Sequence, residues 1–173
     1  MFLQKNHSFT IRNLIFFILI SVFLSCTSNN QSIEITPVVS EYYKTYQINK
    51  NFERFIDFYA EEIELEDIIN GDKIKGKENL KKFFNWNNPN LSRNDSLALI
   101  IEDQIIDKNK VVTKGYFTSF KWNETQVEAM HFTSILYFNE SKKIIRQVDW
   151  INYPSSLVDY KNRNNSNNWI LNN

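Results

Sequence analysis

The chain is poor in the residues that hold small proteins together by covalent bonds or metal ions. Its 173 residues include one cysteine, Cys26, so no internal disulfide is available and stability has to come from a hydrophobic core. Only two histidines occur, and no His, Cys, Asp or Glu cluster has metal-ligand spacing, so we expect no metal site and no cofactor. The three glycines, Gly71, Gly76 and Gly115, do not form a phosphate-binding loop.

An excess of charge of one sign is also lacking. Lys and Arg total 20 and Asp and Glu total 20, and residues 1–25 hold two of the bases and none of the acids. Residues 26–173 therefore carry a formal charge of 18 minus 20, or minus two. The basic residues are scattered among acids and asparagines, which excludes the clustered basic face that a nucleic-acid backbone requires.

Long apolar runs are scarce as well. One run spans Leu14 to Leu24. As a helix it would measure about 16 Å against a bilayer core of about 30 Å, which is too short for a stable transmembrane anchor. The run follows a basic segment and ends at Phe23-Leu24-Ser25-Cys26, which is typical of a signal peptide with a bacterial lipoprotein cleavage site.

We therefore expect a signal peptide over residues 1–25, a lipid on Cys26 and a polar tether over residues 26–34. This organisation anchors the protein by lipid to a membrane of the bacterial cell envelope, on the periplasmic or outer-membrane side. Two alternatives are cleavage by an ordinary signal peptidase, which would leave a free thiol, and an uncleaved N-terminal anchor.

The remaining chain reads as one α+β domain over residues 35–156, followed by an Asn-rich C-terminal tail over residues 157–173. Apolar residues at helical spacing predict three helices, near Val38–Tyr46, Phe52–Phe58 and Lys77–Phe84. From Leu97 onward, runs rich in Ile, Val, Phe, Thr and Tyr alternate with short polar turns, which predicts a meander of antiparallel strands.

The segment Tyr59–Gly76 predicts a half-buried strand that ends in an acid. Ile63 and Leu65 alternate with glutamates, so Asp67 is the next inward position. An unpaired carboxylate in an apolar interior costs several kcal/mol, which makes Asp67 a candidate site residue. The alternative is that Asp67 caps the turn over residues 68–71 or is exposed to solvent.

Two later strands are expected to line a pocket. Residues at alternate positions share one face and would give an apolar wall with polar groups: Tyr116, Thr118, Phe120 and Trp122. In the next strand Phe132 and Ser134 would face the cavity and His131 would face outward. Alternatively, the aromatic rings fill the cone and leave no room for a ligand.

The order of helix, short helix, strand, helix and antiparallel sheet, with FYAEEIELED leading to a glycine before the third helix, resembles the SnoaL-like branch of the nuclear transport factor 2-like superfamily. That superfamily also contains ketosteroid isomerase. The resemblance implies a cone-shaped curved antiparallel sheet wrapped by three N-terminal helices, a cystatin-like arrangement. It also implies a homodimer through the outer face of the sheet.

The resemblance further implies roles for particular residues. Asp67 matches the general base of ketosteroid isomerase, and Tyr42 matches its oxyanion-binding tyrosine. Ser134, or Thr133 if the register slips, stands where that enzyme has a protonated acid.

In the SnoaL-like cyclases the base is an acid on the last strand. Asp149 stands in that region, with Gln147 on the same face. Strand parity alone does not decide its direction, and Asp149 could equally be a structural acid paired with Arg146 or a nearby Lys.

We favour a domain that binds a small apolar ligand or a partner without catalysis, since neither family's full set of catalytic groups is present. The alternative is an acid/base isomerase, cyclase or dehydratase acting on a small apolar carbonyl compound, with Asp67 or Asp149 as base and Tyr42 as donor to the developing oxyanion. A roomy cavity with a perturbed acid would favour the enzyme. A third interpretation, a lipoprotein that stabilises an envelope complex, would use the Trp150 face and the Trp169 tail.

Overall fold

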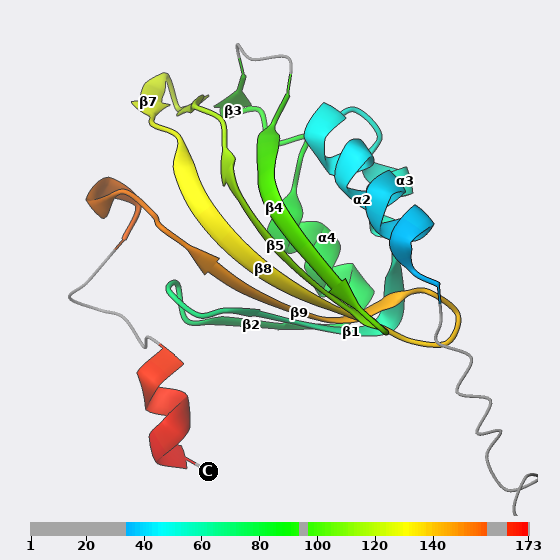
Figure 1. The fold of residues 1–173 in the computed structure, drawn as a ribbon. Helices are drawn as coiled ribbons and strands as arrows, with labels where there is room; N and C mark the ends of the chain where they lie inside the picture. Colours follow the sequence, from blue (N-terminus) through cyan, green and yellow to red (C-terminus); the bar gives the residue numbers. More distant parts are fainter. Residues whose placement is uncertain (1–33, 94–96, 159–165, 173) are drawn as a thin grey trace, which may run out of the picture. The chain divides into compact units, whose positions relative to one another are not determined.

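Three helices lie against the concave face of a curved, six-stranded sheet in the computed structural model of the chain (Figure 1). The structure describes residues 34–93, 97–158 and 166–172, which all belong to one unit that spans Ser32–Asn173. The predicted signal peptide, Cys26 and nearly all of the tether lie outside the described residues. The predicted α+β class is confirmed, and so is the predicted order of helix, short helix, strand, helix and sheet, with the short strand β2 (Asp72–Lys75) added before the third helix.

The helices are α2 (Thr36–Ile48), α3 (Phe52–Ile56) and α4 (Lys77–Phe84). Helix α2 has a proline in its first turn, where the missing N–H costs nothing, and it ends at Asn49 in the left-handed conformation. Helix α4 begins after Gly76, whose φ of 80° favours glycine. A short polar connection therefore separates α2 from α3, whereas the hairpin of β1 (Tyr59–Asp67) and β2 lies between α3 and α4.

An aromatic core joins α2 and α3 to the sheet. Tyr42 on α2 stacks on Phe55 of α3 with ring centroids 5.4 Å apart, and it meets Tyr59 of the first strand edge-on at 5.9 Å. All three rings are almost completely buried. Burial of side chains of this size stabilises the fold by about 1.5–3 kcal/mol each, so this cluster fixes α2 over the sheet.

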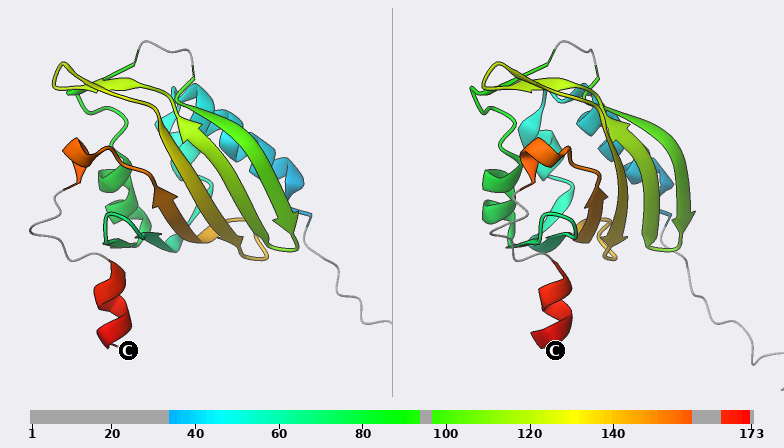
Figure 2. Two further views of the ribbon diagram at one scale, coloured as in Figure 1. Left: turned by 60° about the vertical axis from the view of Figure 1, so that its left-hand side comes forward. Right: turned by 90° about the vertical axis from the view of Figure 1, so that its left-hand side faces the viewer.

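The main sheet has the order β2-β1-β9-β8-β5-β4. Its strands, in that order, are Asp72–Lys75, Tyr59–Asp67, Ile144–Ile151, Met130–Phe138, Lys110–Phe117 and Leu99–Asp107. A small second sheet, in the order β3-β6-β7, consists of Leu91–Ser92, Phe120–Trp122 and Thr125–Val127. Two 3-10 helices follow, η1 (Ser155–Leu157) and η2 (Ser166–Asn172). Figure 2 shows the main strands curving together, with the helices on one side of the sheet.

The main sheet is mixed, and the expectation of an antiparallel sheet throughout is wrong at one pair. Strand β1 runs parallel to β9, whereas β9, β8, β5 and β4 form the predicted antiparallel meander. Hairpin connections produce antiparallel neighbours, but β1 and β9 are joined through most of the chain and are free of that constraint. The parallel pairing places Asp67 beside Asp149.

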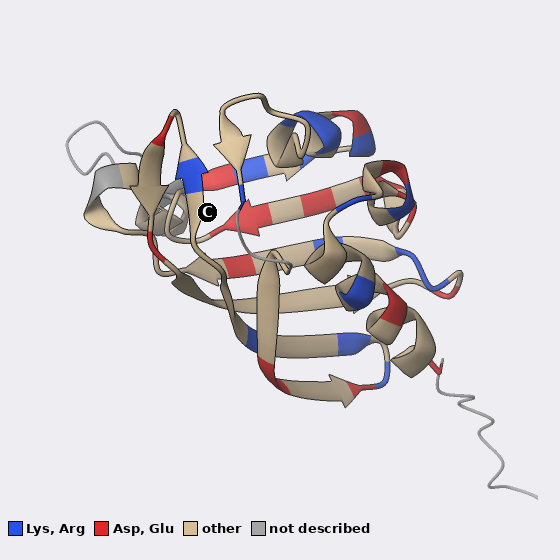
Figure 3. Ribbon diagram, turned by 90° about the horizontal axis from the view of Figure 1, so that it is seen from above, with Lys and Arg blue, Asp and Glu red and all other residues tan. Residues whose placement is uncertain are grey.

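The outward face of β1 carries the glutamates, as the alternation predicted. Glu64 accepts from Lys75 of β2 at 2.7 Å, and Glu66 pairs with Arg146 of β9 at 2.8 Å. Acidic and basic segments lie next to one another along the sheet in Figure 3. Exposed pairs of this kind contribute at most about 1 kcal/mol each, so this face is mainly a solvated surface.

Gly115 allows the sheet to bend. Strand β4 has a bulge between Ile101 and Asp103, opposite Gly115 of β5. A β-carbon on residue 115 would lie 2.2 Å from the carbonyl oxygen of Ile100, inside van der Waals contact. Bulges increase local bending and twist, so this glycine and the bulge together help to curve the wall of the cone.

Replacing Gly115 by alanine should therefore lower the free energy of unfolding by about 1–3 kcal/mol, because the backbone of β4 has to move away. Urea unfolding would measure this loss. The control is Lys114→Ala at the neighbouring exposed position, for which we expect a change within about 1 kcal/mol. Equal losses in the two variants would contradict the close approach.

Candidate functional site

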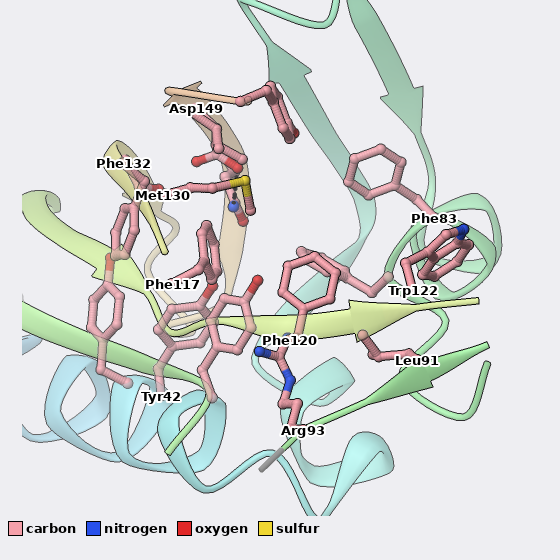
Figure 4. A pocket seen from close by; sticks show the side chains of 17 residues that line it. Tyr42, Phe83, Leu91, Arg93, Phe117, Phe120, Trp122, Met130, Phe132 and Asp149 are labelled. Carbon is pink, nitrogen blue, oxygen red and sulfur yellow. Dashed lines mark hydrogen bonds between the residues drawn. The ribbon is translucent and has the colours of Figure 1, made fainter. Parts of the chain in front are cut away.

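A cavity of about 290 Å³ lies between the helices and the concave face of the sheet (Figure 4). Its wall is mostly aromatic, and the polar side chains gather on β8 and β9 and beside β3. The lining residues are Tyr42, Tyr43, Tyr46, Phe83, Phe84, Leu91, Arg93, Phe117, Phe120, Trp122, Met130, Phe132, Ser134, Gln147, Asp149, Ile151 and Tyr153. The cone is therefore hollow, which rules out the alternative that its aromatic rings fill it.

Asp149 is the acid that reaches this cavity. It is 8% exposed, and its Oδ2 accepts a hydrogen bond from Gln147 Nε2 at 2.7 Å. Its Oδ1 is buried and has no hydrogen-bond partner among the described residues. The predicted alternative, pairing with Arg146, does not occur, since Arg146 is on the outer face with Glu66.

Burial raises the pKa of Asp149 to about 7, because the carboxylate loses its hydration inside an aromatic wall. The hydroxyl of Ser134 and the amide of Gln147 act in the opposite direction, and the charge of Asp67 adds to the rise in pKa. At neutral pH the acid and carboxylate forms of Asp149 are therefore both populated, which suits a group that exchanges protons.

Two hydroxyl groups near Asp149 are also without hydrogen-bond partners in the described part of the chain. Ser134 of β8 is the direct cross-strand neighbour of Asp149, and its hydroxyl is near enough to lower the pKa of Asp149, but its buried Oγ makes no hydrogen bond of good geometry with a described residue. Tyr43 of α2 lines the same cavity, and its buried hydroxyl, near those of Ser134 and Thr113, makes no such hydrogen bond either. Together with Asp149 Oδ1, these atoms form a polar corner in an otherwise apolar cavity. We call this set the polar corner.

Gln147 joins Asp149 to two buried tyrosines. Its Oε1 accepts from the hydroxyl of Tyr59 at 2.8 Å, and the hydroxyls of Tyr59 and Tyr42 are 2.7 Å apart. Since Tyr59 gives its single proton to Gln147, Tyr42 gives its own proton to Tyr59. This corrects the role predicted for Tyr42, because its hydroxyl has no proton left to donate to an oxyanion.

Asp67 is almost completely buried, as the alternation predicted, but it does not line the cavity. Its Oδ1 accepts from the backbone N–H of Asn70 at 2.8 Å, so it caps the turn after β1. Its Oδ2 accepts a 2.5 Å hydrogen bond from the hydroxyl of Tyr153, which does line the cavity. Desolvation raises the pKa of Asp67, and the Tyr153 hydrogen bond opposes this rise.

Of the residues predicted for the aromatic wall, Phe120 and Trp122 line the cavity, but Tyr116 and Thr118 do not. The strand predicted as continuous is interrupted after β5, where Thr118 donates its hydroxyl to the carbonyl oxygen of Leu97. The interruption changes the strand's parity, so Phe117 points inward in place of Tyr116. In β5 itself, Val111, Thr113 and Gly115 are the buried positions, so the inward face continues to Phe117.

Other lining residues were not identified as site residues from the sequence. The helical spacing of Tyr43 and Tyr46 predicts only that they face the core, whereas both line the cavity. Phe83 reaches the cavity from α4, whose spacing predicts a helix but not a cavity wall. Leu91 and Arg93 reach it from β3 and the residue that follows, where the sequence shows no periodic pattern.

The outer face of the sheet carries His131 and Trp150. His131 faces outward as predicted, 3.9 Å from the carboxylate of Glu102, and Trp150 is 40% exposed. The homodimer that the resemblance implies through this face stays a prediction. Among residues 34–93, 97–158 and 166–172, no group of three His, Cys, Asp or Glu side chains is arranged to hold a metal ion. Within the same ranges, no helix has the length and apolar character that crossing a membrane requires.

The raised pKa of Asp149 predicts a pH-dependent stability. An aspartate titrates near 3.8 when unperturbed and near 7 here, so between these values the folded state binds more protons than the unfolded state. The free energy of unfolding should therefore fall as pH rises through this window, by roughly 2–3 kcal/mol between about pH 5 and pH 8. Urea unfolding should show this fall in the wild type. In Asp149→Asn the fall should be smaller by the contribution of Asp149. Identical pH profiles would contradict the desolvated carboxyl.

Comparison with known proteins supports the fold. No family model matches the chain, and no curated protein matches it. Solved structures do match. One, from Shewanella putrefaciens, is named as a SnoaL-like polyketide cyclase, with TM-score 0.57, 16% identity, and coverage of 69% of this chain and 90% of the other.

Two further structures show the same cone. An LEH-like epoxide hydrolase of M. tuberculosis matches with TM-score 0.56 and 12% identity, covering 70% of this chain and 84% of its own. A Catenulispora acidiphila protein with a ketosteroid isomerase-like fold, in complex with trimethylamine, matches with TM-score 0.52 and 14% identity, covering 67% and 83%. The resemblance drawn from the sequence is confirmed at the level of the fold: the chain has the nuclear transport factor 2-like cone that SnoaL-like and ketosteroid isomerase-like proteins share.

Proposed function

We propose that the domain binds a small, mostly apolar carbonyl compound in the cavity and that Asp149 exchanges a proton with it. The observation that carries this proposal is the Asp149 carboxyl, which is buried in an aromatic cavity with Oδ2 held by Gln147 and Oδ1 unpaired. A buried carboxyl without a cationic partner lowers the stability of the fold when it ionises. Such a loss of stability is expected at functional sites.

The same observations favour the enzyme over the binding module without catalysis, which was the preferred interpretation from the sequence. A filled cone would have supported a module, whereas the cavity is open and contains an acid with a pKa of about 7. Near neutral pH such a group is a good enough base to accept a proton and a good enough acid to return it.

The chemistry follows from the polar corner. Oδ1 of ionised Asp149 takes a proton from the carbon next to the substrate carbonyl, and the electron pair of that C–H bond moves into the carbonyl as an enolate. The unpaired hydroxyls of Ser134 and Tyr43 are the available donors to the enolate oxygen. Asp149 then returns its proton to a carbon or oxygen of the substrate, which is the step that isomerases, cyclases and dehydratases have in common.

The test is deuterium incorporation. We expect the wild-type domain in D₂O to exchange the C–H protons beside the carbonyl of small cyclic ketones faster than buffer, with a rate that rises with pH through about 7 as Asp149 ionises. Asp149→Asn should reduce this rate to that of buffer. Mass spectrometry of the recovered ketones measures it.

Variants of adjacent residues provide the control. Ser134→Phe should fill the floor of the cavity and abolish both ketone binding and exchange, whereas Thr133→Phe, on the opposite face of β8, should preserve both. Exchange that survives in Asp149→Asn, or that is lost equally in both phenylalanine variants, would contradict the proposal.

We also propose that Cys26 carries a lipid and that the domain is held at a membrane of the bacterial envelope. The support is the order of a basic segment, the apolar run Leu14–Leu24 and the Ser25-Cys26 pair. A lipid anchor would restrict the domain to two dimensions while leaving the cavity available to small apolar molecules.

Expression of the full chain in a bacterium fed an alkyne-labelled fatty acid tests this. We expect label on the wild type and none on Cys26→Ala, with Ser28→Ala as the labelled control. The wild type should sediment with membranes. An unlabelled wild type in the soluble fraction would refute lipidation.

A further inference from the structure

A chain of four buried polar side chains runs from the cavity acid into the helix layer. Asp149 and Gln147 lie on β9, Tyr59 begins β1, and Tyr42 lies on α2. The three contacts between them measure 2.7, 2.8 and 2.7 Å, so each is a hydrogen bond of good length. Every member is less than about a tenth exposed. We call this set the relay.

The relay has one proton direction when Asp149 is ionised. The carboxylate can only accept, so Gln147 turns its NH₂ group toward Oδ2 and its Oε1 toward Tyr59. Tyr59 then donates to Gln147 and accepts from Tyr42. Turning the amide over would bring Oε1 against Oδ2, which leaves two buried acceptors facing each other and costs the desolvation penalty of both.

We propose that Gln147 is a positioning residue for Asp149: its amide, held in place by Tyr59 and Tyr42, occupies Oδ2 and leaves Oδ1 as the single atom that exchanges a proton with the cavity. Oδ2 is engaged in both protonation states, because a neutral carboxyl that carries its proton on Oδ1 still accepts at Oδ2. The reacting atom therefore keeps its place through the cycle. This inference rests on the proposed function of Asp149 as the acid/base.

The location of the relay explains why it can hold this geometry. Tyr42 and Tyr59 are packed among Phe55, Phe58 and Phe84, with ring centroids 5.4 to 6.1 Å apart. A hydroxyl in such a cluster has few alternative partners, so the orientation of Tyr59 is set by core packing. The helix layer thus controls the orientation of a carboxyl on the sheet.

Other titratable groups face Asp149 and contribute to its titration. Asp67 on the neighbouring strand raises the pKa of Asp149, and the neutral tyrosines around the cavity surround it without charge. These groups come from β1, α2, the residue after β3 and the segment after β9. They are Asp67, Tyr59, Tyr42, Tyr43, Tyr46, Arg93 and Tyr153. They are the same in the wild type and in the Gln147 variant, so the difference between those two proteins isolates the amide.

The experiment is a carboxyl-carbon NMR titration of Asp149 in a domain spanning residues 34–173, with matched variants. Gln147→Leu should raise the midpoint by about one to two units, because the charged form loses a hydrogen bond. Tyr59→Phe should raise the midpoint by less, since the Gln147 amide can still donate to Asp149 but is no longer oriented by the Tyr59 hydroxyl. The controls are Gln126→Leu on β7 and Tyr116→Phe on the outer face, neither of which should move it.

A second readout tests the constant orientation. In the wild type, the side-chain amide protons of Gln147 should show nuclear Overhauser effects to the β-protons of Asp149 at pH values both above and below the midpoint. Contacts that move to the Tyr59 ring at low pH would overturn the proposal. Should Gln147→Leu fail to fold, Tyr59→Phe and these contacts decide the question.

The failure of this inference differs from the failure of the proposed function. An Asp149 midpoint in Gln147→Leu equal to that in Gln126→Leu overturns the relay, whatever the wild-type value. A wild-type midpoint near the ordinary value of 3.8 overturns the proposed function, whatever the variants show.

Discussion

The burial of one carboxyl group without a cationic partner is the constraint on which the site depends. Asp149 faces the cavity because β9 is held on both sides, by β1 in parallel and by β8 in antiparallel pairing. Its desolvation is offset only by neutral groups, Gln147 and Ser134, so its pKa lies near neutrality. Arg146, the residue directly before Gln147, lies on the outer face of β9, where it pairs with Glu66 and is kept away from the cavity.

The aromatic core provides the stability that such a site requires. Phe55, Tyr42 and Tyr59 are buried where α2 and α3 meet the sheet, and they are also next to the cavity. The same residues that fix the helices thus hold the relay behind Asp149. Asp67 accepts a part-buried hydrogen bond from Tyr153, two residues beyond the end of β9, so a second hydrogen bond fixes the cavity wall there.

Much of the fold was predictable because local patterns control it. The alternation in β1 correctly placed Ile63, Leu65 and Asp67 inward, since its register with β9 is regular from Glu64 to Asp67. Parity failed between Gly115 and Phe120, where the chain leaves one sheet and enters another, and Tyr116 was misplaced for this reason. Local sequence patterns could not predict the direction in which Tyr42 donates its proton, or that Asp149 lines the cavity while Asp67 does not. Both depend on contacts between distant residues, such as Tyr59 and Gln147, 88 positions apart.

The central claim is that Asp149 is a desolvated acid facing a cavity, and the most direct test is its own titration. The carboxyl-carbon resonance of Asp149, assigned by comparison with Asp149→Asn, should move with a midpoint of about 7 in the ligand-free domain. A bound ketone analogue should shift that resonance. A midpoint at or below about 4 would show a solvated or ion-paired carboxylate and would contradict the account of the site.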